Sequence, residues 1–112
     1  MSVGVILPLG ATAVIEKSAG WTADLNQAGV VFSSTAAAGI NVTLPAAAPV
    51  GFNFLIAQMG AGQVTFVAAG GAFIRHPLNA TKIAAQYGIA SVTVVRNTGG
   101  AAAEYVLSGY VL

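Results

Sequence analysis

The side chains that could do acid–base or metal chemistry are few in this chain and lie far apart in its sequence. His76 is the only histidine, cysteine is absent, and the only carboxylates are Glu16, Asp24 and Glu104. A metal site needs several His, Cys or carboxylate ligands that converge, and paired catalytic carboxylates must face each other about 5–10 Å apart. A lone histidine before a proline is more typical of a loop or a strand end. We therefore expect no metal, no cofactor and no enzymatic activity.

Motifs for nucleophilic catalysis or phosphate binding are incomplete. A serine, a histidine and an aspartate are all available, but the sequence contains no Gly-x-Ser-x-Gly elbow. The segment Gly60-Ala61-Gly62 has two glycines of a phosphate loop, without the Gly-Lys-Ser/Thr that would follow and without a helix. We interpret this segment as a tight turn between two strands.

Aromatic side chains offer a different chemistry, because their faces can stack on sugar rings. Most of the aromatic residues are expected in the core or in an interface between subunits. Trp21 and Tyr87 are the candidates for contact with a glycan.

The composition is unusual for a free soluble domain. The 112 residues include only four Lys or Arg and three Asp or Glu, while 56% of positions are apolar. Ordinary domains are about one-quarter charged, so we expect much of this surface to be covered by other protein chains. The basic residues are scattered along the chain, which predicts no nucleic-acid binding.

The first segment, 3–15, is nearly all apolar. It lacks a basic start, is interrupted by Gly4, Pro8 and Gly10, and is too short to cross a membrane as a helix. We expect residues 1–20 to form an extended N-terminal arm rather than a signal or a membrane span. The residues expected to contact a neighbouring protein chain are Val3, Val5, Ile6, Leu7, Leu9, Val14 and Ile15.

Residues 21–112 show the period of β-strands, since apolar and polar residues alternate between regular Gly, Pro and Asn breakers. This pattern predicts an all-β fold, namely a single β-sandwich or small barrel-like domain of short antiparallel strands. The predicted strands, including two in the arm, are 3–7, 12–17, 29–34, 40–44, 52–59, 63–68, 72–76, 81–86, 91–96 and 104–111.

Two segments have a predicted place in this fold. The strand 52–59 is almost continuously apolar, which favours a central strand buried on both faces. The glycines at 60–62 predict a hairpin between this strand and the next. The C-terminal segment keeps strand composition to its last residue, so we expect it to be ordered and to contribute an interface through Tyr105, Tyr110, Val111 and Leu112.

Several short motifs follow one another over about four-fifths of the chain. They are Trp21-Thr22-Ala23-Asp24, Gly29-Val30-Val31, Val42-Thr43-Leu44-Pro45, Pro49-Val50-Gly51-Phe52, the run from Gln58 to Phe66, the run from Thr81 to Tyr87, and Tyr105-Val106-Leu107-Ser108-Gly109. In order and spacing they resemble a β-rich module common in tailed-phage and prophage virion proteins. Residues 2–20 have no counterpart in this resemblance.

The resemblance implies a structural role in a virion and frequently a trimer, with no catalytic residues. Because the chain has no fibrous shaft or heptad repeat before the module, it looks most like a capsid decoration, or cement, protein. Such a protein would form a homotrimer on the outer capsid surface and bind the major capsid protein.

Two other roles remain open from the sequence. One is a tail-fibre or tail-spike module that binds host-surface glycans through exposed aromatic residues. The other is a bacterial surface or enzyme-like binding domain that acts alone as a soluble monomer, which the low charge disfavours.

Overall fold

The structure is a computed structural model that describes residues 14–112. Its strands are β1 (Val14–Lys17), β2 (Trp21–Thr22), β3 (Val31–Ser34), β4 (Ile40–Leu44), β5 (Asn53–Gln58), β6 (Val64–Ala68), β7 (Phe73–Arg75), β8 (Ile89–Asn97) and β9 (Ala103–Gly109). A single 3-10 turn, Thr98–Gly100, lies between the last two strands. The described part of the chain is therefore all-β, as the sequence predicts.

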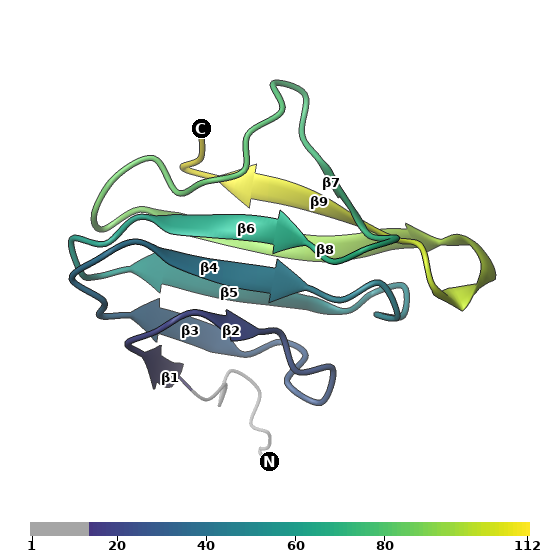
Figure 1. The fold of residues 1–112 in the computed structure, drawn as a ribbon, viewed down its shortest axis with the longest axis horizontal. Coiled ribbons are helices and arrows are strands. Elements are labelled where there is room, and N and C mark those ends of the chain that lie inside the picture. Colours follow the sequence, from purple (N-terminus) through teal and green to yellow (C-terminus); the bar gives the residue numbers. More distant parts are fainter. Residues whose placement is uncertain (1–13) are drawn as a thin grey trace, which may run out of the picture.

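The first six strands form a coil in which the chain alternates between two sheets. β1, β3 and β5 are parallel neighbours in a six-stranded sheet, and β2, β4 and β6 make a parallel three-stranded sheet. Figure 1 shows the smaller sheet lying in front of the larger one. Each turn of the coil thus adds one strand to each sheet.

The last two strands form an antiparallel hairpin that lies between β5 and β7. The order of the large sheet is β1-β3-β5-β8-β9-β7, with β8 antiparallel to both β5 and β9. β7 is parallel to β9 and therefore runs in the same direction as β5. The hairpin occupies the place beside β5 where another parallel strand of the coil would otherwise pair.

The strand pairing corrects two sequence predictions. Antiparallel neighbours were expected throughout, but only β5–β8 and β8–β9 pair in that way, and the sheets are mixed. The predicted hairpin at 60–62 is wrong, because β5 and β6 lie in different sheets. The glycines of this connection allow close stacking on the previous turn of the coil: a Cβ atom on Gly62 would overlap the carbonyl oxygen of Ala38.

The core lies between the two sheets and is built from alternate residues of each strand. In β5, Phe54 and Ile56 are buried whereas Leu55 is 39% exposed. The expected central position of this strand is confirmed, since it is an interior strand of the large sheet. The expected burial on both of its faces is not found in the single chain. A row of aromatic rings runs through the core, with Phe32 packed edge-on against Phe54.

The strand boundaries agree with the sequence in most places. Strand 40–44 is found with the predicted bounds, whereas 81–86 forms only isolated bridges, at Lys82 and Ile83. The two-residue strand β2 was not predicted. The predicted strand 3–7 lies outside the described residues. Of the predicted arm, Val14–Lys17 forms β1 at the edge of the large sheet, paired with β3.

Candidate functional site

The outer face of the six-stranded sheet, meaning the side chains that point away from the core, is the largest regular surface of the described chain. Strand register places residues of this face in rows across the sheet, one of which runs from Val14 through Val31 and Leu55 to Ser91 and Ser108. The next row ends in Val106 and Arg75.

The centre of this outer face carries no charged side chain. Apolar, hydroxyl and amide side chains fill it, with Asn53 as the amide, and Ser91 and Ser108 share a hydrogen bond of 2.7 Å. The exposed large apolar side chains of this face are Val14, Leu55, Phe73, Ile89, Val95 and Val106. Surfaces of this kind are typical of contact with another protein.

Charge gathers at the β7 end of the outer face, where two arginines hold one glutamate. Arg96 donates to both carboxylate oxygens of Glu104, at 2.5 and 2.8 Å, and the Nε of Arg75 donates to Oε1 at 3.1 Å. The guanidinium of Arg75 also lies 4.6 Å from the ring centroid of Phe73. This Arg–Glu–Arg group carries one net positive charge and lies at the edge of the apolar face.

The ion pairs shift the acid–base behaviour of this group. The hydrogen bond from Arg96 is the main cause that lowers the pKa of Glu104, from 4.5 to about 2. Burial opposes this shift, and Arg75 adds to it. The same hydrogen bond raises the pKa of Arg96. Glu104 is therefore an ionised structural partner at neutral pH rather than a proton donor.

The loop after β7 forms the wall of a small open pocket beside Arg75. The pocket has a volume of about 410 Å³ and is lined by Ile74, Arg75, His76, Pro77, Asn79 and Val106. His76 shapes the loop, because its Nδ1 accepts hydrogen bonds from the backbone N–H groups of Leu78 and Ala80. Asn79 adopts the left-handed conformation with φ 59°.

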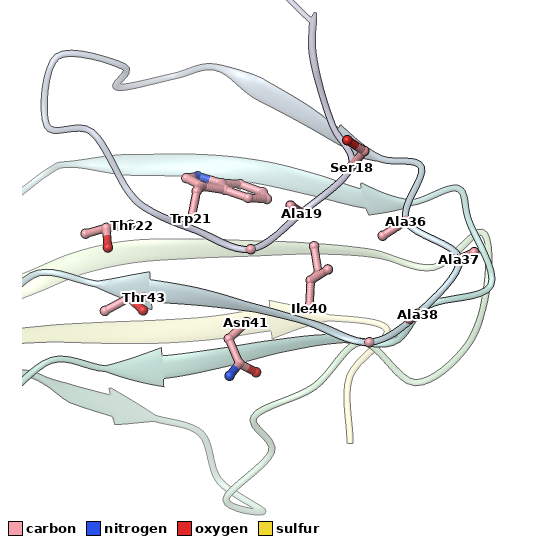
Figure 2. Close-up of a pocket in the computed structure, with 12 residues that line it drawn as sticks. Ser18, Ala19, Trp21, Thr22, Ala36, Ala37, Ala38, Ile40, Asn41 and Thr43 are labelled. Atoms are coloured by element: carbon pink, nitrogen blue, oxygen red, sulfur yellow. The ribbon is translucent and has the colours of Figure 1, made fainter.

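A second, larger groove lies beside β2, where the strand is only two residues long. It has a volume of about 610 Å³ and is lined by residues 18–22, 36–41 and 43. In Figure 2, Trp21 of β2 and Ile40 of β4 extend to one side of these two strands, while Asn41 and Thr43 of β4 extend to the other. Apart from Trp21, Ile40 and Asn41, the side chains that line this groove are small or carry a hydroxyl.

Trp21 is not an open stacking platform. Its ring packs against Phe32 with 5.1 Å between ring centroids, and the Nζ of Lys17 lies 5.1 Å from its centroid. Its indole Nε1 is buried and has no hydrogen-bond partner among residues 14–112. Trp21 therefore serves mainly to pack β2 against β3 in the first turn of the coil.

Tyr87 is the exposed member of the predicted glycan pair. Its side chain is 71% exposed, and its backbone is left-handed with φ 70°. Tyr110, which is 62% exposed, lies against Gly88, the residue that follows Tyr87, since a Cβ atom on Gly88 would be 3.1 Å from Tyr110 Cδ2. Tyr87 does not line the groove beside Trp21, so the structure does not bring the two predicted residues to one site.

The predicted C-terminal interface residues divide into two groups. Tyr105 is fully buried and belongs to the core. Val111 pairs with Ile83 in an isolated bridge and packs against the core, whereas Tyr110 and Leu112 are exposed. Tyr110 and Leu112 are therefore the most accessible of the four to another chain.

The predicted arm residues also differ in position. Val14 is exposed on the outer face, and Ile15 points inward and packs against the core. Val3, Val5, Ile6, Leu7 and Leu9 lie outside the described residues. The arm can therefore be placed only where it becomes β1.

The potential metal ligands remain apart. Within residues 14–112, no three His, Cys, Asp or Glu side chains come together as a metal site. Over the same residues, no helix is long and apolar enough to cross a membrane.

Comparison of the chain with protein-family models, curated proteins and solved structures finds no match.

Proposed function

We propose that this protein is a structural subunit of a permanent homo-oligomer, with a mechanical rather than a catalytic role. The observation that carries the proposal is the outer face of the six-stranded sheet. Its centre is uncharged, and it combines hydroxyl side chains with exposed apolar ones such as Leu55, Ile89 and Val106. Burying such a face removes apolar area from water, which stabilises an assembly by roughly 25 cal/mol per Å² before the costs of association.

The sparse charge supports a permanent contact rather than a transient one. Obligate interfaces bury more than about 2,000 Å² and are depleted in charge at their centres. Four basic and three acidic residues serve the whole chain, and three of these charged side chains are joined at one end of the sheet. A face of this kind fits a protein that stays bound to its partner.

The more specific form of the proposal is a trimeric capsid decoration protein of a tailed phage. It rests on the resemblance of residues 21–112 to the β-rich virion module. The N-terminal segment would act as an arm on a neighbouring subunit or on the major capsid protein, and the two sheets would form one sandwich at the outer capsid surface.

A substitution on the outer face tests the oligomer directly. Leu55→Lys should convert the assembly to monomers in light-scattering measurements while the far-UV circular dichroism stays unchanged. Val67→Lys is a matched control, because Val67 is 38% exposed, like Leu55 at 39%, but lies on the three-stranded sheet. A wild-type protein that is monomeric at all concentrations would contradict the proposal.

The location is tested by the copy number of the protein in purified phage particles, measured by quantitative mass spectrometry against the major capsid protein. Hundreds of copies in a fixed ratio would support capsid decoration. A few dozen or fewer would place the protein on the tail, and its absence from particles would remove the virion assignment.

A tail module that binds host glycans is the second candidate, and the neighbouring exposed Tyr87 and Tyr110 favour it. On this alternative, Tyr87→Ala should abolish retention on a host-glycan array. Trp21→Ala is a poor test of the same idea, because Trp21 packs against Phe32 and its loss would disturb the core.

A further inference from the structure

The Arg–Glu–Arg group is not balanced in charge, and the excess lies on Arg75. Arg96 satisfies both oxygens of Glu104, whereas Arg75 reaches Glu104 only through its Nε. The terminal amino groups of Arg75 make no hydrogen bond with residues 14–112, and the side chain is 53% exposed. They are available to a second carboxylate, which would leave the group neutral.

The pocket beside Arg75 adds an apolar wall to this positive charge. Val106 and Pro77 line it together with Arg75, and Val106 lies on the outer face of the sheet. A fitting partner would present a carboxylate close to a small apolar side chain. Arginine is well suited to such a partner because its planar fork can donate two parallel hydrogen bonds.

The opposite edge of the same sheet carries that pattern. Val14 and Glu16 are both exposed and both point to the outer face of β1, about 7 Å apart at the rise of a strand. Glu16 forms no hydrogen bond or ion pair with the described residues. Asp24, by contrast, already accepts a hydrogen bond from the backbone N–H of Asn26 in its own turn.

We propose that β1 of one copy docks beside β7 of the next copy. Glu16 accepts hydrogen bonds from the terminal amino groups of Arg75, and Val14 packs against Val106 and Pro77. The proposal rests on the homo-oligomer proposed above and adds a specific contact at the edges of its outer face. Since β1 and β7 are opposite edges of one sheet, the contact joins different surfaces of the two copies, and it forms a ring such as a trimer when the rotation from copy to copy closes.

Side chains rather than backbone make this contact. Charged residues on edge strands discourage the addition of further strands, and β1 carries both Glu16 and Lys17. β7 is only three residues long, and Arg75 folds over Phe73 beside it. Both edges thus disfavour backbone hydrogen bonds between the sheets of two copies. The specificity of the contact then comes from the ion pair between Glu16 and Arg75.

The test is a double-mutant cycle on the dissociation constant of the wild-type oligomer, measured by analytical ultracentrifugation. Glu16→Gln and Arg75→Gln should each raise the dissociation constant per contact about tenfold, the range of a partly exposed ion pair. The dissociation constant of the double variant should not exceed the higher of the two single-variant values, because both substitutions remove the same ion pair. Asp24→Asn is the control and should leave the constant unchanged. Because Arg75→Gln also removes a bond to Glu104, urea unfolding must show that each variant folds.

The outcomes separate this inference from the proposed function. A stable wild-type oligomer that is unaffected by Glu16→Gln, or variants whose effects simply add, would overturn the contact and leave the structural role intact. A monomeric wild type would overturn both. In a final arm, glucuronate is titrated while the Arg75 side-chain resonances are followed by NMR. If glucuronate binds Arg75 saturably and the assembly does not change, Arg75 binds a soluble carboxylate rather than Glu16 of another copy.

Discussion

The hydroxyl of Tyr105 donates a hydrogen bond of 2.6 Å to the carbonyl oxygen of Pro45. Tyr105 belongs to β9 of the large sheet, and Pro45 directly follows β4 of the small sheet. This bond therefore ties the two sheets together. Replacing Tyr105 with Phe should lower the free energy of unfolding by about 1 kcal/mol, because an acceptor loses its partner. Urea unfolding at neutral pH measures this loss, and the exposed Tyr110→Phe should show none.

Tyr105 also predicts a loss of stability at alkaline pH. Burial raises its pKa from 10.0 to about 12, so the folded protein holds this proton more tightly than the unfolded chain. The contribution is fully present below pH 10 and is lost as pH rises from 10 toward 12. The urea midpoint of the wild type should fall over this interval more steeply than that of Tyr105→Phe. Parallel curves would contradict the prediction.

Glu104 predicts the opposite dependence at acid pH. Its folded pKa of about 2 lies below the ordinary 4.5, so its contribution is present above pH 4.5 and is lost as pH falls toward 2. Glu104→Gln should be less stable than the wild type at pH 6, and the difference should shrink between pH 4.5 and pH 2.5. An unchanged difference over this range would show that the ion pairs with Arg96 and Arg75 do not stabilise the fold.

Gly62 should tolerate no side chain. A Cβ atom there would overlap the carbonyl oxygen of Ala38 and lie 2.5 Å from its carbonyl carbon. Because both are backbone atoms of the previous turn of the coil, Gly62→Ala should cost about 1–3 kcal/mol of unfolding free energy. Gly70→Ala is the control, since no atom lies within 4 Å of the added Cβ. Thermal unfolding of the two variants should differ clearly, and equal values would argue against this stacking.

Ser34 is a position where removal of a polar group should help. It is fully buried in β3, and its hydroxyl has no hydrogen-bond partner among residues 14–112. Ser34→Ala should therefore leave stability unchanged or raise it by up to about 1 kcal/mol. Ser33→Ala, on the outer face, is the neighbouring control with little expected effect. A large loss from Ser34→Ala would reveal a partner for this hydroxyl.

The sequence was sufficient to predict most of the strands but not their partners. The alternation in Ile40–Leu44 marks a half-buried strand, and it is the same for parallel and antiparallel pairing. The glycines at 60–62 fit a hairpin and a connection between sheets equally well. Only the packing of Gly62 on the backbone of Ala38 distinguishes the two, and no local pattern records that contact.

The candidate site was predicted less completely. Low charge indicated a surface covered by protein, but the outer face depends on register between strands distant in sequence, such as Leu55 opposite Ser91. The same is true of Glu104, which meets Arg75 from another strand. The packing of Trp21 on Phe32 was not predicted, because the two-residue strand that carries Trp21 is too short to show a period.

The hairpin between β5 and β7 has a consequence for the order of events during synthesis on the ribosome. β5 is complete at Gln58, yet its antiparallel partner β8 begins only at Ile89. Until that strand emerges, the nascent coil presents the unpaired hydrogen-bonding groups of β5 to any neighbouring chain. The growing polypeptide is thus most exposed to aggregation between the emergence of β5 and that of β8, and C-terminal truncations that remove β8 should be recovered mainly as insoluble protein.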